Sequence, residues 1–470
     1  MRRTKVIATI GPACEDEDTL RQMIAAGMNV ARLNLSHGSL VSHAGKLELV
    51  RRVADTMDAN VGIMVDTRGR EIRTGELTGG VAELERGQSF TLTSKPGAGN
   101  AQGVSVTHPC LHEHVSAGER ILLDDGNLEL RVEGVSGDLV RCRVEYGGTL
   151  RNSKGVNLPD NGTVFGAIDS QSDDDLEFAA SCDTQYVAAS FIRSADDVEE
   201  IRRKLRALGS DIPIIAKIEN RSGVDNLDSI IAAADGTMVA RGDLGVELGL
   251  ARGPTIQKRI IRATVSNGKP VITATQMLDS MERNPRPTRA EASDVANAIL
   301  DGTSAVMLSG ETAVGAYPVE SVRTIVSLTL EAEAGLRDFG FLQQILPNPS
   351  NVVTEAVAQA SITMANHLQA AAIVALTETG FTSRLISKYR PGCPILAVTS
   401  SLAVMRRLSM NWGVETVRYE GAAGDEDKLR FAMAQTKALG YAKSGDVLVA
   451  TAGSHSQAGS TDLIRVLTVD

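Results

Sequence analysis

Two short stretches decide how we interpret the fold: Pro213-Ile214-Ile215-Ala216-Lys217-Ile218-Glu219-Asn220 and Gly236-Thr237-Met238-Val239-Ala240-Arg241-Gly242-Asp243. Each starts as an apolar strand, ends in charged residues and is followed by a helix-like segment, which is typical of β/α units. In barrels of parallel strands the functional side chains lie at the C-terminal ends of the strands. We therefore expect Lys217, Glu219 and Asp243 to share one site.

The chemistry of these three side chains indicates a divalent metal beside an anionic substrate. Oxygen ligands suit Mg²⁺, which usually takes one or two carboxylates and keeps some water. The alternative is a salt bridge within the barrel. The metal is favoured because charged or polar residues end other strands as well.

The other apolar runs complete a set of about eight strands. They lie at residues 4–10, 29–38, 61–66, 185–193, 269–277 and 305–312. Eight strands in right-handed β/α units predict a (β/α)8 TIM barrel.

The second of these strands has an unusual end. Arg32, Asn34 and Ser36 alternate, which predicts that they share one face. An arginine there favours an anion such as phosphate, and the oxygens of Asn34 and Ser36 suit a weakly charged cation. The alternative is an ordinary Asx or Ser turn. His37 follows, and a loop histidine is more often a polar surface group than a catalyst.

Two further regions break the barrel pattern. Residues 75–158 contain short β-like runs separated by turns and show no helical periodicity, which predicts an inserted small β-barrel lid domain over the barrel mouth. Lys154 in its return hinge either reaches a nucleotide phosphate or is solvated. A C-terminal open-sheet α/β domain begins near Pro347, and its Thr377–Arg384 loop is a generic phosphate cradle. We expect domain boundaries at 1–67, 68–157, 158–338 and 339–470.

Composition narrows the class of protein. The chain has 470 residues, a net charge of −10, 43% hydrophobic and 23% charged residues, as in ordinary globular proteins. The acidic balance argues against nonspecific nucleic-acid binding. No apolar run reaches the length of a membrane span or resembles a signal peptide. The five cysteines form no C-x-x-C pair, which predicts reduced thiols in a cytoplasmic protein.

Several separated motifs resemble those of the pyruvate kinase family, and the resemblance covers nearly the whole chain. They are Arg32–Gly38, Lys217–Asn220, Met238–Glu247, Ile272–Met281, Asn284–Glu291 and Val306–Thr312. The family makes pyruvate and ATP from phosphoenolpyruvate and ADP. The resemblance implies a Mg²⁺- and K⁺-dependent enzyme, usually a homotetramer, with a phosphorylated effector.

The resemblance also implies a role for each site residue. Mg²⁺ is expected on Glu219 and Asp243, and K⁺ on Asn34, Ser36, Asp66 and Thr67. The expected catalytic residues are Lys217, Thr275, Arg32 and Arg73, with Ser309 and water on the proton path. Substrate contacts are expected from Arg32, Gly242, Asp243 and Thr275, and nucleotide contacts from Asn34, His37, Arg73 and Lys154. The effector loop would use Thr377, Thr379, Gly380 and Thr382.

Four features matter when the chain is compared with the family pattern. Arg70 replaces a proline, which predicts a looser lid hinge, and Ser170-Gln171-Ser172 replaces an acidic-basic-acidic run. Glu71 stands where K⁺-independent members carry lysine, so we expect K⁺ dependence. Glu378 and Phe381 replace cations at the site for fructose 1,6-bisphosphate, so we expect activation by a monophosphorylated sugar or nucleotide, or none.

Two other functions share some of these features. One is a lyase or phosphomutase with a Mg²⁺-enolate barrel, which has no reason to carry the lid, Lys154 or the K⁺ cluster. The other is a catalytically silent sugar-phosphate sensor. A sensor would be free to lose Lys217, Glu219 or Asp243, and all three are present.

Overall fold

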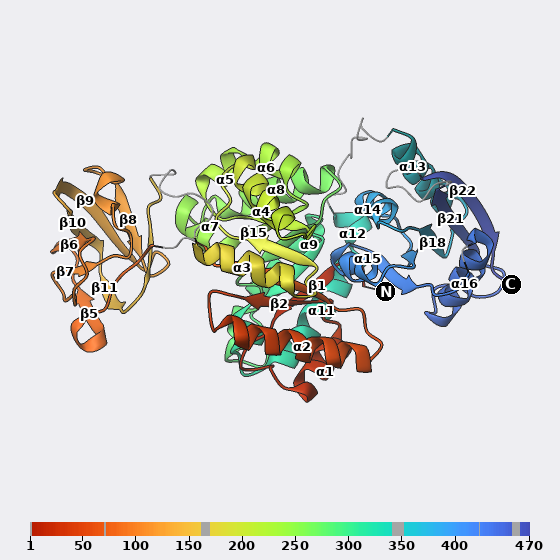
Figure 1. Ribbon diagram of the computed structural model, residues 1–470, viewed down its shortest axis with the longest axis horizontal. Helices are drawn as coiled ribbons and strands as arrows, with labels where there is room; N and C mark the ends of the chain where they lie inside the picture. Colours follow the sequence, from red (N-terminus) through yellow and green to blue (C-terminus); the bar gives the residue numbers. More distant parts are fainter. Residues whose placement is uncertain (1, 70–71, 161–169, 341–351, 423, 454–460) are drawn as a thin grey trace.

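Three domains follow one another along the long axis of the molecule (Figure 1). The computed structural model describes residues 2–69, 72–160, 170–340, 352–422, 424–453 and 461–470. A β domain lies at one end, a barrel with its helices lies in the centre, and an α/β domain lies at the other end (Figure 1). In the described residues, no helix combines the length and the apolar character needed to cross a bilayer.

The central domain is a closed barrel of eight parallel strands, as predicted. The strands follow one another around the barrel in chain order, and the last pairs with the first through Lys5 and Ala305. The strands are β1 (Lys5–Thr9), β2 (Val30–Asn34), β3 (Gly62–Asp66), β13 (Tyr186–Ala189), β14 (Ile214–Ile218), β15 (Gly236–Ala240), β16 (Val271–Ala274) and β17 (Ala305–Leu308).

Helices surround this barrel and bury their apolar faces against the strands. Two large clusters of buried aliphatic side chains lie between the helices and the strands. The helices are α1 (Glu17–Ala26), α2 (Leu40–Thr56), α3 (Ser170–Ser181), α4 (Ala195–Ala207), α5 (Arg221–Asp225), α6 (Leu227–Ala233), α7 (Arg241–Leu248), α8 (Gly253–Ser266), α9 (Arg289–Leu300), α10 (Gly310–Ala313), α11 (Pro318–Ala334) and α12 (Leu336–Phe339).

The sequence places the ends of several helices correctly. Ser194 caps α4 and exchanges hydrogen bonds with Asp197, while Thr288 and Glu291 form the expected capping box of α9. Gly27 ends α1 with a φ of 116°, a conformation that a residue with a Cβ atom adopts only under strain. These local signals fix where the chain leaves and re-enters the barrel.

The second strand is shorter than predicted. It ends at Asn34, whose side-chain Oδ1 accepts a hydrogen bond from the Ser36 amide at 3.2 Å. The prediction that Ser36 shares a strand face with Arg32 is therefore wrong, because the Asn34 side chain turns the chain before the alternation can continue. Ser36 and His37 lie exposed in this turn.

The inserted domain consists of β-strands. Seven strands form one sheet in the order β4-β12-β8-β9-β10-β6-β7, and β5 pairs with β11. Hydrogen bonds from Gly75 N to Ser105 O (2.7 Å) and from Thr107 N to Arg73 O (2.9 Å) join the two edges of the sheet, so it closes on itself. The strands are β4 (Ile72–Arg73), β5 (Val81–Leu84), β6 (Ser89–Thr93), β7 (Gly103–Ser105), β8 (Arg120–Leu123), β9 (Leu128–Ser136), β10 (Leu139–Tyr146), β11 (Gly148–Arg151) and β12 (Gly155–Asn157).

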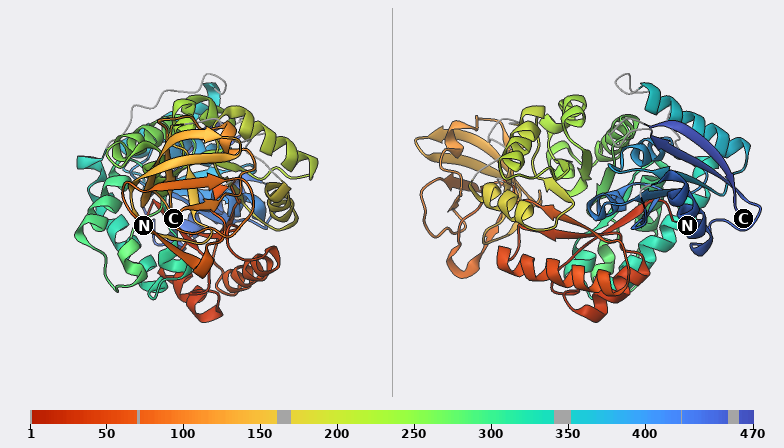
Figure 2. Two further views of the ribbon diagram at one scale, coloured as in Figure 1. Left: turned by 90° about the vertical axis from the view of Figure 1, so that its left-hand side faces the viewer. Right: turned by 45° about the vertical axis from the view of Figure 1, so that its right-hand side comes forward.

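The β domain covers the end of the barrel where the strands finish, as the end-on view shows (Figure 2, left). It follows directly from the C-terminal end of β3. A Cβ atom placed on Gly126 of this domain would lie 3.7 Å from the side chain of Val246 in α7. The predicted lid therefore lies over the strand ends that carry the charged residues.

The C-terminal domain has an open sheet in the order β20-β19-β18-β21-β22, in which only β22 is antiparallel. Aliphatic clusters on both sides of the sheet bury it under the helices. Its elements are α13 (Val352–His367), β18 (Ala372–Leu376), α14 (Phe381–Lys388), β19 (Ile395–Thr399), α15 (Leu402–Arg407), β20 (Val414–Arg418), α16 (Asp425–Ala438), β21 (Val447–Gly453) and β22 (Thr461–Thr468).

This domain closes the opposite end of the barrel. Met410, which follows α15, is fully buried in the cluster of side chains that fills the barrel interior. Lys5 at the start of β1 donates a hydrogen bond to Val414 O at 2.7 Å, and Tyr186 at the start of β13 donates one to Arg407 O. The C-terminal domain therefore lies at the end of the barrel opposite the strand ends that carry the charged residues.

Candidate active site

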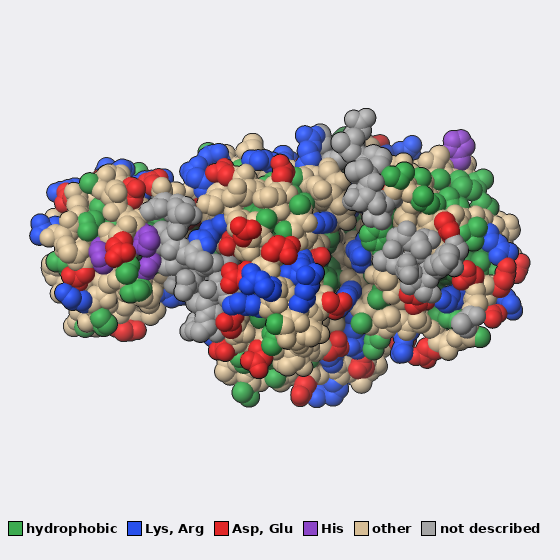
Figure 3. Space-filling model, turned by 45° about the horizontal axis from the view of Figure 1, so that its top comes forward, with side chains coloured by type: hydrophobic (Ala, Val, Ile, Leu, Met, Phe, Trp, Pro, Cys, Tyr) green, Lys and Arg blue, Asp and Glu red, His purple; other side chains and the backbone are tan. Residues whose placement is uncertain are grey.

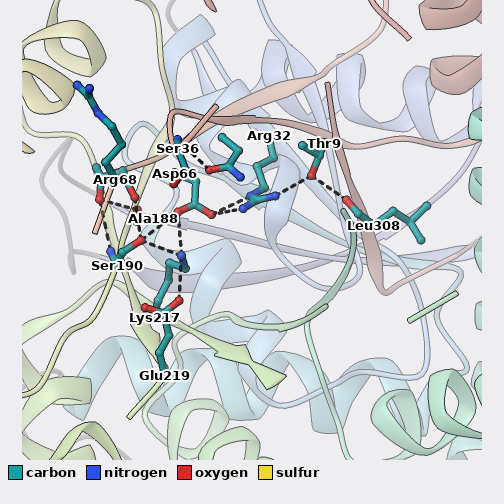
Figure 4. Close-up of polar contacts among 12 residues, drawn as sticks. Thr9, Arg32, Ser36, Asp66, Arg68, Ala188, Ser190, Lys217, Glu219 and Leu308 are labelled. Carbon is teal, nitrogen blue, oxygen red and sulfur yellow. Dashed lines mark hydrogen bonds and ion pairs between the residues drawn. The ribbon is translucent and has the colours of Figure 1, made fainter. Parts of the chain in front are cut away.

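Lys217 is the centre of the charged cluster at the strand ends (Figure 4). Its Nζ lies 3.0 Å from Asp66 Oδ1, 3.0 Å from Glu219 Oε1 and 2.8 Å from Ser190 Oγ. The carboxylates of Asp66 and Glu219 are each only 1% exposed. Three neighbouring strands, β3, β13 and β14, therefore hold one ammonium group by all three of its donors.

Arg32 extends this network to β2. Its guanidinium lies 2.7 Å from Asp66 Oδ2 and also donates a hydrogen bond to Thr9 Oγ1 at 2.9 Å. The Thr9 hydroxyl in turn donates to the carbonyl oxygen of Leu308 at 2.9 Å. Asp66 is thus shared between two cations, one on each of its oxygens (Figure 4).

The network keeps its members charged. Burial acts to lower the pKa of Lys217, but the carboxylates of Asp66 and Glu219 outweigh it and raise that pKa above its ordinary value. Burial likewise acts to raise the pKa of Asp66, yet Lys217 and Arg32 hold it below its ordinary value. The site therefore presents a permanent ammonium, a guanidinium and a carboxylate near neutral pH.

Glu219 lies close to the backbone of the neighbouring strand end. Its Oε2 accepts a hydrogen bond from the Phe191 amide at 2.6 Å. Phe191 has a φ of 55°, an uncommon value for a bulky residue. This strained turn aims an amide at Glu219 and fixes one carboxylate oxygen, while the other faces Lys217.

Asp243 lies in the first turn of α7, just after β15, the strand next to β14. Its charge contributes to the raised pKa of Lys217, after the larger effects of burial, Asp66 and Glu219. The structure thus brings Asp243 into the electrostatic environment of Lys217. Asp243 and Glu219 come from adjacent strand ends, as predicted.

Thr275 and Gly242 meet at the next strand end. The Gly242 amide donates a hydrogen bond to Thr275 Oγ1 at 2.9 Å, and that hydroxyl donates to Ala274 O at 2.7 Å. Thr275 has a φ of 65°, which is rare for a β-branched residue and places it under strain. The Arg241 guanidinium supports this turn by donating to Thr275 O at 2.6 Å.

Glu311 is a functional candidate that the sequence analysis missed. Its side chain is buried, and its two oxygens accept hydrogen bonds from Leu278 N (3.0 Å) and Ser309 N (2.7 Å). Glu311 therefore joins the end of β17, which carries Ser309, to the loop that follows Thr275. The Ser309 hydroxyl is buried and has no hydrogen-bond partner within the described part of the chain.

Ser190 and Arg68 were also missed. Ser190 Oγ contacts Lys217 and donates to Thr67 O at 2.8 Å. Arg68, where the chain leaves for the lid, binds Asp175 of α3 through its backbone amide (2.7 Å) and its Nη2 (2.6 Å). The polar ends of these segments were visible in the sequence, but their partners lie more than 20 residues away.

The predicted nucleotide residues of the lid lie at its hinge. Arg73 Nη1 donates to Ser153 O at 2.9 Å, and Lys154 Nζ lies 2.7 Å from Asp124 Oδ1. Hydrogen bonds between Lys154 N and Thr74 Oγ1 (2.9 Å) and between Thr74 N and Lys154 O (2.8 Å) join the two hinge strands. Arg73 and Lys154 thus lie near each other at the return to the barrel.

Part of the predicted K⁺ site falls within the network already described. Asp66 is paired with Lys217 and Arg32, and Thr67 O accepts from Ser190 Oγ. Asn34 and Ser36 lie in the turn after β2. Glu71 and Arg70 lie outside the described residues, as do the side chains of Ser170 and Gln171.

The predicted effector loop joins β18 to α14. Thr377 Oγ1 accepts from the Gly380 amide at 2.9 Å, and Thr382 contacts Thr461 through their hydroxyls. Glu378 pairs with Lys428 at 2.8 Å, close to Thr379 in sequence. The carboxylate and its lysine therefore satisfy each other beside this loop.

The donor set suits a metal that is completed by substrate. Within the described ranges, no group of three or more histidine, cysteine, aspartate or glutamate side chains is arranged to hold a metal alone. Mg²⁺ is typically bound by one or two carboxylates together with substrate phosphates and water. Glu219 and Asp243, on adjacent strand ends, are the candidate carboxylates for a ligand set of this kind.

Together the fold and the site define a (β/α)8-barrel enzyme with a buried cluster of charged side chains at the strand ends, beneath an inserted β domain. Comparison with known proteins makes the assignment specific. Residues 1–322 match the model of the pyruvate kinase barrel domain, and residues 355–467 match that of the pyruvate kinase alpha/beta domain. The chain belongs to the pyruvate kinase family.

Individual relatives agree along the whole chain. A pyruvate kinase of Geobacillus stearothermophilus is 47% identical over 470 residues, covering 99% of this chain and 80% of the relative. One from Clostridium acetobutylicum is 43% identical over 473 residues and is covered completely. A crystal structure of a pyruvate kinase from Cryptosporidium parvum has a TM-score of 0.92 at 37% identity, covering 100% of this chain and 96% of that one.

Proposed function

We propose that this chain transfers the phosphoryl group of phosphoenolpyruvate to ADP, giving pyruvate and ATP. Membership of the pyruvate kinase family supports the reaction. The observation that carries the proposal for this site is the position of Lys217, between Asp66 and Glu219 at the strand ends of the barrel. Phosphoryl transfer depends mainly on positioning and on neutralising negative charge, which is what a fixed ammonium provides.

Glu219 and Asp243 are the residues that we expect to hold Mg²⁺. When bound there, Mg²⁺ supplies positive charge to the substrate oxygens and helps to orient them. Lys217 supplies a second positive charge at the transferred phosphoryl group, and its raised pKa keeps it protonated. Arg32 and Arg73 are the guanidinium groups that we expect to contact phosphates.

Amide groups at the start of α7 are proposed to bind the substrate carboxylate. The amides of Gly242 and Asp243 open this helix, where backbone N–H groups and the helix dipole favour an anion. The Gly242 amide bonds to Thr275 Oγ1 in the structure, so substrate would have to share or replace that contact.

Proton delivery to the enolate completes the proposed reaction. Thr275 and Ser309 carry hydroxyls at adjacent strand ends, and Glu311 joins the Ser309 amide to the Leu278 amide in the loop that follows Thr275. A threonine hydroxyl is a poor acid by itself, so we assign Thr275 the role of a relay between water and the substrate carbon. We assign the buried Ser309 hydroxyl to the same relay, because it has no hydrogen-bond partner within the described part of the chain.

The finer properties of the enzyme are also proposals. We infer K⁺ dependence through Asn34, Ser36, Asp66 and Thr67, and nucleotide contacts from Asn34, His37, Arg73 and Lys154. We propose an effector site at Thr377, Thr379, Gly380 and Thr382, and the domain boundaries 1–67, 68–157, 158–338 and 339–470.

We also propose that the chain forms a homotetramer and is located in the cytoplasm. On the face seen in Figure 3, acidic and basic side chains are interspersed over the barrel, and hydrophobic side chains gather over part of the C-terminal domain. Val352, Val353, Leu463 and Val466 of that domain are exposed. These surfaces support a homotetramer. The five free thiols support a cytoplasmic location.

Product analysis tests the reaction directly. The purified chain with phosphoenolpyruvate, ADP, Mg²⁺ and K⁺ should form pyruvate and ATP in equal amounts. Pyruvate without ATP, or a rearranged phosphorylated product, would instead indicate a lyase or a phosphomutase. Binding of sugar phosphates without turnover would indicate a sensor.

A further inference from the structure

A small cavity lies between the barrel and the C-terminal domain, at the end of the barrel opposite the proposed active site. It is lined on the barrel side by the segment around Lys269 and by Ser304, which precede β16 and β17, and on the other side by α14, Arg390 and Trp412. Its volume of about 10 Å³ is the room that one water-sized particle needs.

The lining of this cavity is strongly basic. Lys269, Arg384, Lys388 and Arg390 all contribute to it, and none of its described lining residues is acidic. Lys388 is neutralised by Glu355, 2.8 Å away and equally buried. The other three cations form no ion pair with any described residue, in a chain whose net charge is −10. The Lys269 ammonium donates instead to the carbonyl oxygens of Ile231, Ala232 and Ala234, and Arg384 Nη1 donates to Thr379 O at 3.2 Å.

Arg390 is the least satisfied of these cations. Its Nη2 donates to Gly302 O (2.8 Å) and Ser304 Oγ (3.2 Å), whereas Nε and Nη1 are buried and have no partner among the described residues. Its guanidinium lies 4.4 Å from the centre of the Trp412 ring. Burial lowers the pKa of Arg390 to about 9, and the charge of Glu333, which acts to raise that pKa, only partly offsets it.

Buried donors of this kind normally have an acceptor, and buried charges normally have a counter-charge. A bound anion would supply both. The cavity is too small for a phosphorylated metabolite, and its volume fits a monatomic ion. Both domains contribute cations, so such an ion would join the C-terminal domain to the barrel.

We propose that this cavity binds one small inorganic anion of the halide class, held by the guanidinium of Arg390, while Lys269 and Arg384 add positive charge to the lining. The site is distinct from the proposed active site, and it shares Arg384 with the Thr377–Arg384 loop. Its occupant stabilises the contact between the two domains.

Trp412 makes the proposal testable, because it is the only tryptophan of the chain and is just 3% exposed. The probe is potassium bromide, a heavy-atom quencher, titrated against potassium gluconate at constant ionic strength. We expect saturable quenching of Trp412 fluorescence that added chloride reverses. Acrylamide, a neutral quencher, should act weakly because the ring is buried.

Two variants distinguish a site from general accessibility. Arg390→Met should abolish the saturable phase. Arg3→Met is the matched control, because Arg3 lies 5.6 Å from the same ring but does not line the cavity; it should keep the saturable phase. In the wild type, replacing gluconate by chloride should raise the thermal midpoint by about 2–4 °C, and Arg390→Met should lose this shift.

Three results would overturn the proposal: bromide quenching that rises linearly without saturation, equal quenching in Arg390→Met and wild type, or a midpoint that follows ionic strength regardless of the anion. If Arg390→Met does not fold, the wild-type titration and its reversal by chloride decide the question alone. These readouts do not involve catalysis, so they are independent of the proposed function.

Discussion

Replacing Lys217 with methionine is the change that the site geometry makes most informative. Methionine keeps most of the side-chain length but removes the ammonium that lies 3.0 Å from both Asp66 and Glu219. Removing one donor that stabilises charge in the transition state typically lowers kcat by about 10²–10³-fold, equivalent to about 3–4 kcal/mol. We expect at least a 10²-fold loss of turnover.

The same substitution should also lower stability. Asp66 and Glu219 are each 1% exposed, and breaking a buried ion pair by removing one partner typically costs about 3–5 kcal/mol. Asp66 keeps Arg32 and Glu219 keeps the Phe191 amide, so we expect the lower end of that range. Thermal unfolding must therefore be measured beside activity, at a temperature where the variant is folded.

The assay is the initial rate of ATP formation at saturating phosphoenolpyruvate and ADP. Lys95→Met is the matched control, because it removes an ion-paired lysine whose side chain is 79% exposed, just after β6 of the β domain. It should keep its turnover and lose at most about 1 kcal/mol of stability. A folded Lys217→Met variant with turnover within threefold of wild type would refute the reasoning.

Four further predictions concern separate parts of the chain. Glu311→Gln should lower kcat about tenfold or more with little change in KM and alter the pH profile, because Glu311 positions the two hydroxyls of the proton path; unchanged kcat would contradict this. Burial raises the pKa of Glu247 to about 7 from 4.5, so folding favours the neutral carboxyl group. The stability that results is fully present below pH 4.5 and is lost as the pH rises through 7. The wild type should lose about 3 kcal/mol of unfolding free energy between pH 4.5 and pH 7, and Glu247→Gln should not show this loss; urea unfolding at both pH values measures it. Turnover should depend on K⁺, as Glu71 indicates. Turnover in tetramethylammonium buffer free of Na⁺ and K⁺ that equals turnover in K⁺ would contradict this. Fructose 1,6-bisphosphate should leave the half-saturating phosphoenolpyruvate concentration almost unchanged because Glu378 disfavours a bisphosphate; a large decrease would show otherwise.

The sequence predicted the barrel well because each strand carries its own signal. An apolar run followed by Lys217 or Asp243 identifies both the strand and the end that bears the site. The capping residues Ser194 and Thr288 were also predictable, since a cap depends only on residues three positions away.

Long-range contacts were not predictable in the same way. Arg32 was expected to contact an anion, but its partner Asp66 belongs to the next strand, and only strand register brings them together. Met410 fills the barrel interior from a domain that follows the barrel in sequence, and an isolated methionine carries no local sign of that role. Ser190 was missed because a single serine at a strand end is common.

The turn at Asn34 shows how one side chain overrides a pattern. Alternation placed Ser36 on the face of Arg32, but the Asn34 side chain bonds to the Ser36 amide and ends the strand. The side-chain oxygen competes with strand pairing for the backbone amide, and this competition is a local effect. An Asx or Ser turn was the alternative interpretation of this stretch from the sequence, and a turn is the conformation that the structure adopts.

The central claim is that Glu219 and Asp243 hold one metal ion beside Lys217. Its most direct test is the affinity for Mn²⁺, a paramagnetic substitute for Mg²⁺, measured by electron paramagnetic resonance with phosphoenolpyruvate present. Glu219→Gln and Asp243→Asn should each weaken binding by about tenfold or more, and the double variant should lose much less than the product of the two. Wild-type Mn²⁺ affinity in either single variant, or fully multiplicative losses in the double variant, would contradict a shared ion.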